Sequence, residues 1–346
     1  MSYTGSIGEA GRALDVRAVE IVGEGREARL RLGEAADPRP KAGELLIDVV
    51  AAGINRGDTL QRQGLYPPPP GASPIIGLEC AGRVAELGEG VSNFACGDRV
   101  MALLPGGGYA ERAVAHAGSV LPVPPGLSLT EAGGIPEVFL TCHLTLFDLG
   151  RVWTGETVLV HGGGGGIGTA AIQLLSRAGA RVLVTAGSAE KCASCLELGA
   201  ERAVRYGDES FAEAALDWTE GRGVDAILDH VGGAYLEDNI RCLARGGRLI
   251  LIGVMAGASG TLDLGRMLGR HLSVIGSTLR PRSVVEKAAL VERFRKRFGE
   301  DLSARRLSAV VDRVFPLAEA QAAHERMEKS LHTGKIVLQV REERPG

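Results

Sequence analysis

The feature that most constrains this chain is a run of glycines directly after an apolar, β-branched segment. Residues 157–162 read Thr-Val-Leu-Val-His-Gly, and residues 163–168 continue as Gly-Gly-Gly-Gly-Ile-Gly. A helical pattern begins at once, so the glycines form a turn between a strand and a helix. In such a turn, backbone N–H groups and the positive end of the helix dipole point toward a bound anion. The pattern predicts a pyrophosphate-binding loop made by Gly163, Gly165, Gly166, Ile167 and Gly168.

Strand and helix patterns alternate over the next hundred residues. Helices are predicted over 167–178 and 189–198, and further strands at 181–185, 203–206, 224–229, 248–253 and 272–276. This alternation predicts an α/β fold with a doubly wound parallel sheet of the Rossmann type, which binds its ligand at the carboxyl ends of the strands. The alternative is an α/β domain whose glycine turn binds no nucleotide.

The end of the second strand indicates which dinucleotide binds. NAD sites usually have an acid there for the ribose 2′-hydroxyl, whereas this chain reads Thr-Ala-Gly-Ser from residue 185. A hydroxyl and a cation suit a 2′-phosphate, which a carboxylate would repel. Glu190 complicates this, but the helix is expected to point it away from the face of Lys191. We therefore expect NADPH over NADH, with Lys191 as an ordinary solvated lysine as the alternative. The residues expected at this end are Gly187, Ser188, Lys191 and Tyr206.

Length, charge and cysteine usage favour an intracellular enzyme of two domains. The chain has 346 residues and a net charge of −3, which argues against nucleic acid as the main partner. No apolar run reaches the length of a membrane span, and residues 1–16 are expected to form a flexible extension without a signal core. Six cysteines show no disulfide framework, so a reducing, cytoplasmic setting is expected. The Cys192–Cys195 pair lies in a predicted helix without a second pair, which argues against a metal.

The N-terminal half has a different, β-rich pattern. Short strands are predicted at 44–53, 82–85, 99–103 and 109–114, with turns between them that suit a small, partly open barrel. The C-terminal segment is expected to return to this domain through a strand at 310–315, a helix at 317–330 and a strand at 336–340.

Several motifs together resemble the medium-chain dehydrogenase/reductase superfamily, most closely its NADPH quinone oxidoreductase branch and the tumour-suppressor-inducible type within it. They lie at 52–58, 61–71, 77–82, 96–100, 101–111 and 333–337. The resemblance implies a GroES-like β-barrel catalytic domain (17–137 and 279–346), an inserted Rossmann NADPH-binding domain (138–278) and a homodimer.

Departures from the zinc-dependent branch favour a metal-independent reaction. This chain has Asn55 and Leu78 where zinc alcohol dehydrogenases have a cysteine and a histidine, and Cys96 stands alone where a structural zinc would need four cysteines. Without a Lewis acid, oxidising an alcohol is hard, whereas reducing an electron-poor acceptor needs no metal. The predicted activity is that of an NADPH:quinone oxidoreductase acting on a quinone or another small α,β-unsaturated carbonyl compound.

The resemblance also implies roles for residues outside the glycine loop. Asn55 would lie beside the nicotinamide as a catalytic residue, and Tyr66 would overhang the cleft; the alternatives are a turn-capping asparagine and a tyrosine that packs the prolines. The other residues expected at the cofactor are Thr141, Gly253, Met255 and, toward the adenosine phosphate, His332. Residues interpreted as structural are His143, His161, His230 and, as packing under the sheet, Tyr109.

Two other functions stay open at this stage. An enoyl-thioester reductase shares the fold and the hydride chemistry. It would need a long groove and a hydroxyl acid over the cleft, and Tyr66 could be that acid. A protein of another class, which binds NADPH but no longer catalyses a reaction, would keep the glycine loop, Lys191 and Tyr206.

Overall fold

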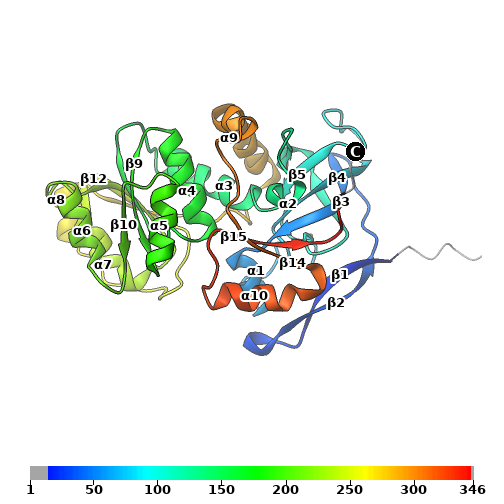
Figure 1. Ribbon diagram of the computed structural model, residues 1–346, viewed down its shortest axis with the longest axis horizontal. Helices are drawn as coiled ribbons and strands as arrows, with labels where there is room; N and C mark the ends of the chain where they lie inside the picture. Colours follow the sequence, from blue (N-terminus) through cyan, green and yellow to red (C-terminus); the bar gives the residue numbers. More distant parts are fainter. Residues whose placement is uncertain (1–14, 344–346) are drawn as a thin grey trace, which may run out of the picture.

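The computed structural model describes residues 15–343, which form two lobes joined by helix α3 (Pro136–Cys142) (Figure 1). One lobe contains a six-stranded sheet in the order β10-β9-β8-β11-β12-β13, with every pair parallel. Counted along the chain this order is 3-2-1-4-5-6, that of the doubly wound dinucleotide-binding sheet, with its reversal between β8 and β11. The strands are β8 (Thr157–Val160), β9 (Arg181–Ala186), β10 (Arg202–Arg205), β11 (Val224–Asp229), β12 (Leu243–Leu251) and β13 (Ser273–Gly276).

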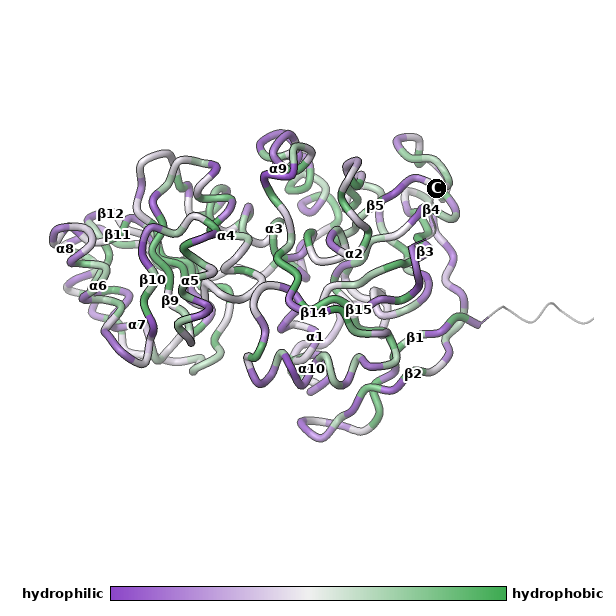
Figure 2. The backbone as a smooth tube through the Cα atoms, in the orientation of Figure 1, coloured by the Kyte–Doolittle hydropathy of each residue, from purple (hydrophilic) through white to green (hydrophobic). Residues whose placement is uncertain are grey.

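Alternate residues of the central strands face two separate cores, as a buried parallel sheet requires. Val158 and Val160 of β8 pack in a core with α4, whereas Leu159 packs in a second core with α6 and α7. The strands of the two larger sheets are rich in apolar residues, as the hydropathy colouring shows (Figure 2). The helices of this lobe are α4 (Gly166–Arg177), α5 (Ala189–Glu197), α6 (Phe211–Trp218), α7 (Leu236–Cys242) and α8 (Leu264–Arg270).

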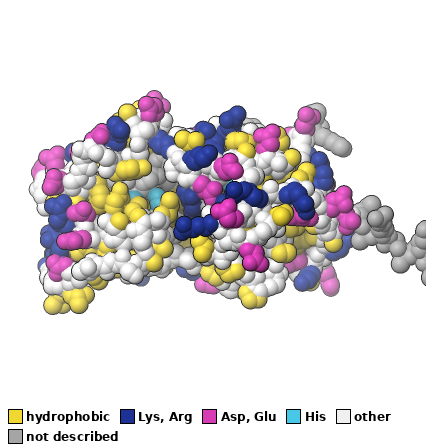
Figure 3. Space-filling view, turned by 90° about the horizontal axis from the view of Figure 1, so that it is seen from below, with side chains coloured by type: hydrophobic (Ala, Val, Ile, Leu, Met, Phe, Trp, Pro, Cys, Tyr) yellow, Lys and Arg dark blue, Asp and Glu magenta, His cyan; other side chains and the backbone are white. Residues whose placement is uncertain are grey.

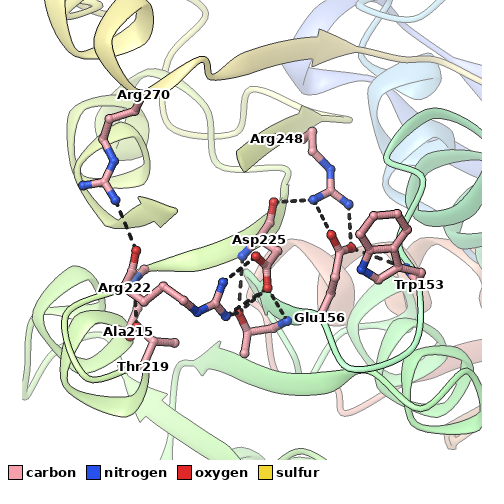
Figure 4. Close-up of polar contacts among 10 residues, drawn as sticks. Trp153, Glu156, Ala215, Thr219, Arg222, Asp225, Arg248 and Arg270 are labelled. Carbon is pink, nitrogen blue, oxygen red and sulfur yellow. Dashed lines mark hydrogen bonds and ion pairs between the residues drawn. The ribbon is translucent and has the colours of Figure 1, made fainter. Parts of the chain in front are cut away.

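A polar network fastens the amino ends of the central strands (Figure 4). Arg222 pairs with Asp225 at 2.6 Å, and the same carboxylate accepts the backbone N–H of Thr157 at 2.8 Å. Arg248 binds Glu156 through two nitrogens at 2.9 and 2.7 Å, and its guanidinium also donates to the Asp225 carbonyl. Two-point contacts of this kind hold strands in register. This network lies away from the carboxyl ends of the strands, the edge at which sheets of this kind bind ligands.

The second lobe is a β-structure built from both ends of the chain. Its seven-stranded sheet runs β14-β15-β3-β4-β5-β7, with β6 paired to β3, and a separate antiparallel hairpin joins β1 and β2. The strands are β1 (Asp15–Val22), β2 (Arg29–Ala36), β3 (Glu44–Gly53), β4 (Glu79–Leu87), β5 (Arg99–Leu103), β6 (Arg112–His116), β7 (Val120–Pro122), β14 (Val311–Pro316) and β15 (Lys335–Gln339). Its α-helices are α1 (Arg56–Arg62), α2 (Leu129–Ala132) and α10 (Ala320–Glu328).

Two connections hold the lobes together. Helix α3 continues without a break into a π-helical segment (His143–Leu149), and both pack against the long helix α9 (Val284–Ser303). Gly334, just before β15, forms an isolated parallel bridge with Gly165, and its N–H donates to the Gly164 carbonyl at 2.8 Å. The start of β15 therefore lies directly on the glycine loop.

All six predicted strands of the parallel sheet are present, while several elements outside it escaped prediction. The sequence patterns gave no helix at α1 or α9 and no hairpin at β1–β2. The expected domain boundary between residues 137 and 138 falls inside α3. Of the expected N-terminal extension, residues 1–14 lie outside the described residues, and Asp15 and Val16 begin strand β1.

Candidate active site

The glycine loop has the backbone geometry of an anion site. Gly162 has a φ of +66°, and the Gly165 N–H closes the turn on the Gly162 carbonyl at 3.0 Å. The first intrahelical bond of α4 runs from Thr169 N to Gly165 O at 2.9 Å. The N–H groups of residues 166–168 come before that bond and are available to an anion.

Close backbone contacts explain why glycine is needed in this loop. A β-carbon on Gly168 would overlap the Gly162 carbonyl oxygen and the backbone of Gly163. One on Gly163 would press into Val184 and Cys195. The loop thus packs tightly against its strand and helix, and the residues present fit the pyrophosphate of a dinucleotide.

The residues predicted for the 2′-phosphate follow β9 and β10, except His332, which precedes β15. Lys191 reaches across to the Ser330 carbonyl at 2.7 Å. Burial, and next the charge of nearby Lys191, lowers the pKa of His332 to about 4. The Tyr206 side chain is 55% exposed, and its hydroxyl lies against Gly187. Buried Nδ1 of His332 has no hydrogen-bond partner among residues 15–343. Lys191 and His332 therefore lie near each other, and the Tyr206 hydroxyl lies beside Gly187.

Glu190 complicates this end of the site. Ser188 caps α5 by accepting the Lys191 N–H at 3.3 Å, and its side chain also hydrogen-bonds Glu190, which lowers the pKa of that exposed carboxylate. Glu190 therefore lies beside Ser188, and the expectation that it points away from the helix face of Lys191 stays a prediction. The Lys191 side chain lies against Gly164 of the glycine loop.

The residues predicted at the nicotinamide end surround the junction of the lobes. Gly253 follows β12 and lies against the backbone of His230, and the Met255 N–H donates to the His230 carbonyl at 3.0 Å. Met255 is 55% exposed, so it is not a core side chain. Thr141 is on α3 and only partly buried. Seen from below, this junction holds recessed histidine atoms, with apolar side chains on one side and basic and acidic ones on the other (Figure 3).

Asn55 belongs to a buried network centred on a lysine. The Lys335 ammonium donates to Asn55 Oδ1 at 2.7 Å and to the Ile54 carbonyl at 2.8 Å, and it pairs with Glu79 Oε1 at 2.7 Å. Asn55 Nδ2 in turn donates to Glu79 Oε1 at 2.9 Å. The side chains of Lys335 and Glu79 are 2% and 0% exposed. The Asn55 amide is thus oriented by a fixed cation and a fixed carboxylate, one on each side.

A second buried carboxylate lies behind Asn55. Asp58 accepts the Asn55 N–H at 2.7 Å and the Tyr109 hydroxyl at 3.2 Å, and that hydroxyl also lies 3.1 Å from His324 Nε2. Burial raises the pKa of Asp58 to about 7, in spite of the bond from Asn55 and the charge of Lys335. Tyr109 is part of the core, as expected, and in addition holds this carboxylate.

Tyr66 is partly buried and is held by an arginine from a distant segment. The Arg280 guanidinium lies over the Tyr66 ring, 5.1 Å from its centroid, and donates to the Tyr66 carbonyl at 3.0 Å. Burial is the main cause that raises the pKa of the Tyr66 phenol. The ring also lies beside Gly57, at the start of α1, which brings it close to Asn55.

Two of the histidines interpreted as structural have buried partners. His161 is fully buried between Thr185 Oγ1 (3.1 Å) and Asn239 Oδ1 (2.8 Å), and burial lowers its pKa to about 3. His143 packs against Phe147, Phe294 and Phe298. Among residues 15–343, no group of three or more His, Cys, Asp or Glu side chains is arranged to hold a metal ion. In the same part of the chain, no helix is long and apolar enough to cross a bilayer.

Comparison with known proteins gives the family. Residues 41–125 match the alcohol dehydrogenase GroES-like domain, and residues 166–293 match the zinc-binding dehydrogenase model. A probable quinone oxidoreductase of Schizosaccharomyces pombe is 32% identical over 92% of this chain and 96% of its own length. The chain belongs to the zinc-independent quinone oxidoreductase type of medium-chain dehydrogenase/reductase.

Solved relatives include two kinds of reductase. An Escherichia coli quinone oxidoreductase complexed with NADPH superposes on this medium-chain reductase with a TM-score of 0.83 at 28% identity, covering 94% of this chain and all of the other. The CurK enoyl reductase gives a TM-score of 0.82 at 28% identity, covering 94% of this chain and 99% of its own. The first curated relatives are Mycobacterium polyketide synthase subunits, of whose length the chain spans only 15% at 33% identity.

Several residues that build the site were not singled out from the sequence. Glu79, Asp58 and Lys335 have charged side chains that are usually interpreted as solvated. A signal existed for two of them, because Glu79 lies between Leu78 and Cys80 and Lys335 directly precedes an apolar run at 336–338. Arg280, more than two hundred positions from Tyr66, had no such local signal.

Proposed function

We propose that this reductase uses NADPH to reduce a quinone or another electron-poor α,β-unsaturated carbonyl compound without a metal ion. Support comes above all from the junction at Gly334, where the glycine loop and the start of β15 meet. Gly334 contacts the glycine loop, and the next residue is Lys335, which binds Asn55. The anion site at the start of α4 and the Asn55 network are therefore neighbours.

The chain's own residues would divide the work as follows. The N–H groups of residues 166–168 would bind the pyrophosphate, and Lys191, Tyr206 and His332 the 2′-phosphate. Bound NADPH supplies the hydride. Lys335 and Glu79 hold the Asn55 amide in place, and Tyr66 presents a flat surface on which an acceptor could stack. Asn55 and Leu78 offer an amide and an alkyl group, not the thiolate and imidazole that a catalytic zinc needs.

The test is a screen of NADPH oxidation by the purified protein over quinones, enals and enoyl-thioesters. NADH replaces NADPH in one arm, and a chelator is added in another. Turnover of quinones or enals with NADPH, unchanged by the chelator, is expected. Activity that disappears on chelation would contradict the metal-free reaction, and equal efficiency with NADH would contradict the cofactor preference.

An enoyl-thioester reductase is the second candidate, and the likeness to the CurK enoyl reductase favours it. Turnover of crotonyl-thioester well above that of quinones would establish it in place of the first. Protein that quenches NADPH fluorescence but reduces none of these acceptors would instead be a binding protein without catalysis.

We also propose that the protein is a cytoplasmic homodimer. The edge strand β13 and helix α8 expose apolar side chains, with Leu264 at 71%, Leu268 at 80% and Val274 at 37%, which a second copy would cover. All six cysteines are unpaired, as in a reducing compartment. Light scattering should give twice the chain mass, and a monomer with Leu268→Glu; a wild-type monomer would contradict the dimer.

A further inference from the structure

Helix α3 exposes one narrow stripe toward the junction of the lobes. Of its seven residues, five are buried and only Glu137 and Thr141 are not. These two are four positions apart, so their side chains lie on the same face, one turn above the other. Thr141 is the residue expected at the nicotinamide, which puts Glu137 on the face where the acceptor would react.

Glu137 is tied to the Asn55 network through its backbone. Its N–H donates to Glu79 Oε2 at 2.9 Å, while Glu79 Oε1 takes Lys335 and Asn55. Its carboxyl group, by contrast, has no hydrogen-bond or ion-pair partner among residues 15–343. A partly exposed carboxyl without a protein partner is free to bond a bound molecule.

Charged groups from five other segments surround this carboxyl. Glu79 of β4 and Asp58 of α1 disfavour a negative charge there, whereas Lys335 of β15, Lys287 of α9 and Arg280 favour it. The phenol of Tyr66 is also near and is neutral, because its pKa is raised. Burial is the largest effect, and it raises the pKa of Glu137 to about 8, with Glu79 next. Because the neutral form of an acid predominates below its pKa, Glu137 carries its proton at neutral pH.

We propose that Glu137 is the proton donor to the acceptor, an inference that rests on the proposed function. After hydride reaches the β-carbon of an enone, the acceptor is an enolate. The Glu137 O–H bond breaks, its proton forms a C–H bond at the α-carbon, and the electron pair stays on the carboxylate. Water then returns a proton to Glu137, which is partly exposed. For a quinone, the proton goes to the hydroquinone oxygen.

The variant Glu137→Gln tests this, because it keeps the shape and the N–H bond to Glu79 but removes the acidic proton. With an enone, wild-type kcat should fall as pH rises through about 8. In Glu137→Gln, kcat at pH 7 should drop about 10²-fold and the alkaline fall should disappear. The drop with a quinone should be smaller, since a hydroquinone oxygen is readily protonated by water. The matched control is Glu197→Gln on exposed helix α5, which should behave as wild type.

A readout without turnover separates this inference from the proposed function. Carboxyl ¹³C NMR of the protein alone should show one glutamate that titrates near pH 8 and is missing from Glu137→Gln. The Kd for NADPH, measured by fluorescence titration, should differ less than threefold between Glu137→Gln and wild type. Wild type that reduces no acceptor would overturn the proposed function, and with it the donor role, even if the NMR signal titrates near pH 8.

Other outcomes overturn the inference alone. The inference is wrong if the Glu137 carboxyl titrates near pH 4. It is also wrong if Glu137→Gln has the kcat and the pH profile of wild type. Glu137→Asp keeps an acid one methylene shorter, so it should retain part of the activity and the alkaline fall. If the glutamine variant does not fold, Glu137→Asp decides: the inference holds if the alkaline fall persists and fails if it is lost.

Discussion

Replacing Lys335 with methionine removes the cation at the centre of the Asn55 network while keeping the volume of the side chain. The Glu79 carboxylate would stay buried with two bonds, from Asn55 Nδ2 and the Glu137 N–H, but without a counter-charge. The Asn55 and Ile54 carbonyl oxygens would each lose a donor. Breaking one partner of a buried ion pair costs about 3–5 kcal/mol. We expect the β-barrel lobe to lose that amount of stability.

Cys80 offers a local measurement of this loss, because it is fully buried directly beside Glu79. Its thiol can react only when the lobe opens, so labelling followed by peptide mass spectrometry reports the free energy of opening. About 3–5 kcal/mol corresponds to labelling roughly 10²- to 10⁴-fold faster. This readout does not require the whole two-lobed chain to unfold in one step.

A double variant separates the charge from the packing. Lys335→Met with Glu79→Gln has no buried charge, so it should recover at least half of the lost stability. The control is Lys329→Met, which replaces an exposed lysine six positions before Lys335. It should change the free energy of unfolding by less than about 0.5 kcal/mol. A loss below about 1 kcal/mol in Lys335→Met, or strictly additive effects in the double variant, would refute the reasoning.

Three further changes test other parts of the site. Gly168→Val should abolish NADPH binding, measured by fluorescence titration, because its side chain would overlap the backbone at Gly162. Lys191→Ala should lower kcat/KM for NADPH about 10- to 100-fold and leave that for NADH nearly unchanged, since a charge-assisted bond to the 2′-phosphate is lost; equal losses would argue against that contact. Asp58→Asn tests linkage. The folded pKa of Asp58, about 7, lies above its ordinary 3.8, so the folded state binds the extra proton and ionisation destabilises it. Wild-type stability relative to Asp58→Asn should therefore fall as pH rises from about 4 to about 7, by at most about 4 kcal/mol in urea titrations; a constant difference would contradict the shift.

The predictable part of the fold is the part with local, periodic signals. The parallel strands read as apolar runs, and the glycine loop had its strand and helix beside it, so both were identified. Asn55 came from the family resemblance, because an asparagine by itself indicates a turn as readily as a site. Its partners were missed since a buried ion pair joins residues far apart in sequence, such as Glu79 and Lys335. Glu137 looked like an ordinary first-turn helix acid, and only its burial, together with nearby Glu79, makes it an acid that keeps its proton.

The bridge between Gly165 and Gly334 has a consequence for how such proteins can be recombined. The last strand of the barrel begins on the loop that binds the dinucleotide, and the residue after Gly334 is the lysine that orients Asn55. A chimera that takes its nucleotide lobe from one relative and its barrel from another must therefore inherit the loop and the segment before β15 from the same parent. If the loop and the segment before β15 come from different parents, the hybrid should fold, but its Asn55 amide should be misoriented.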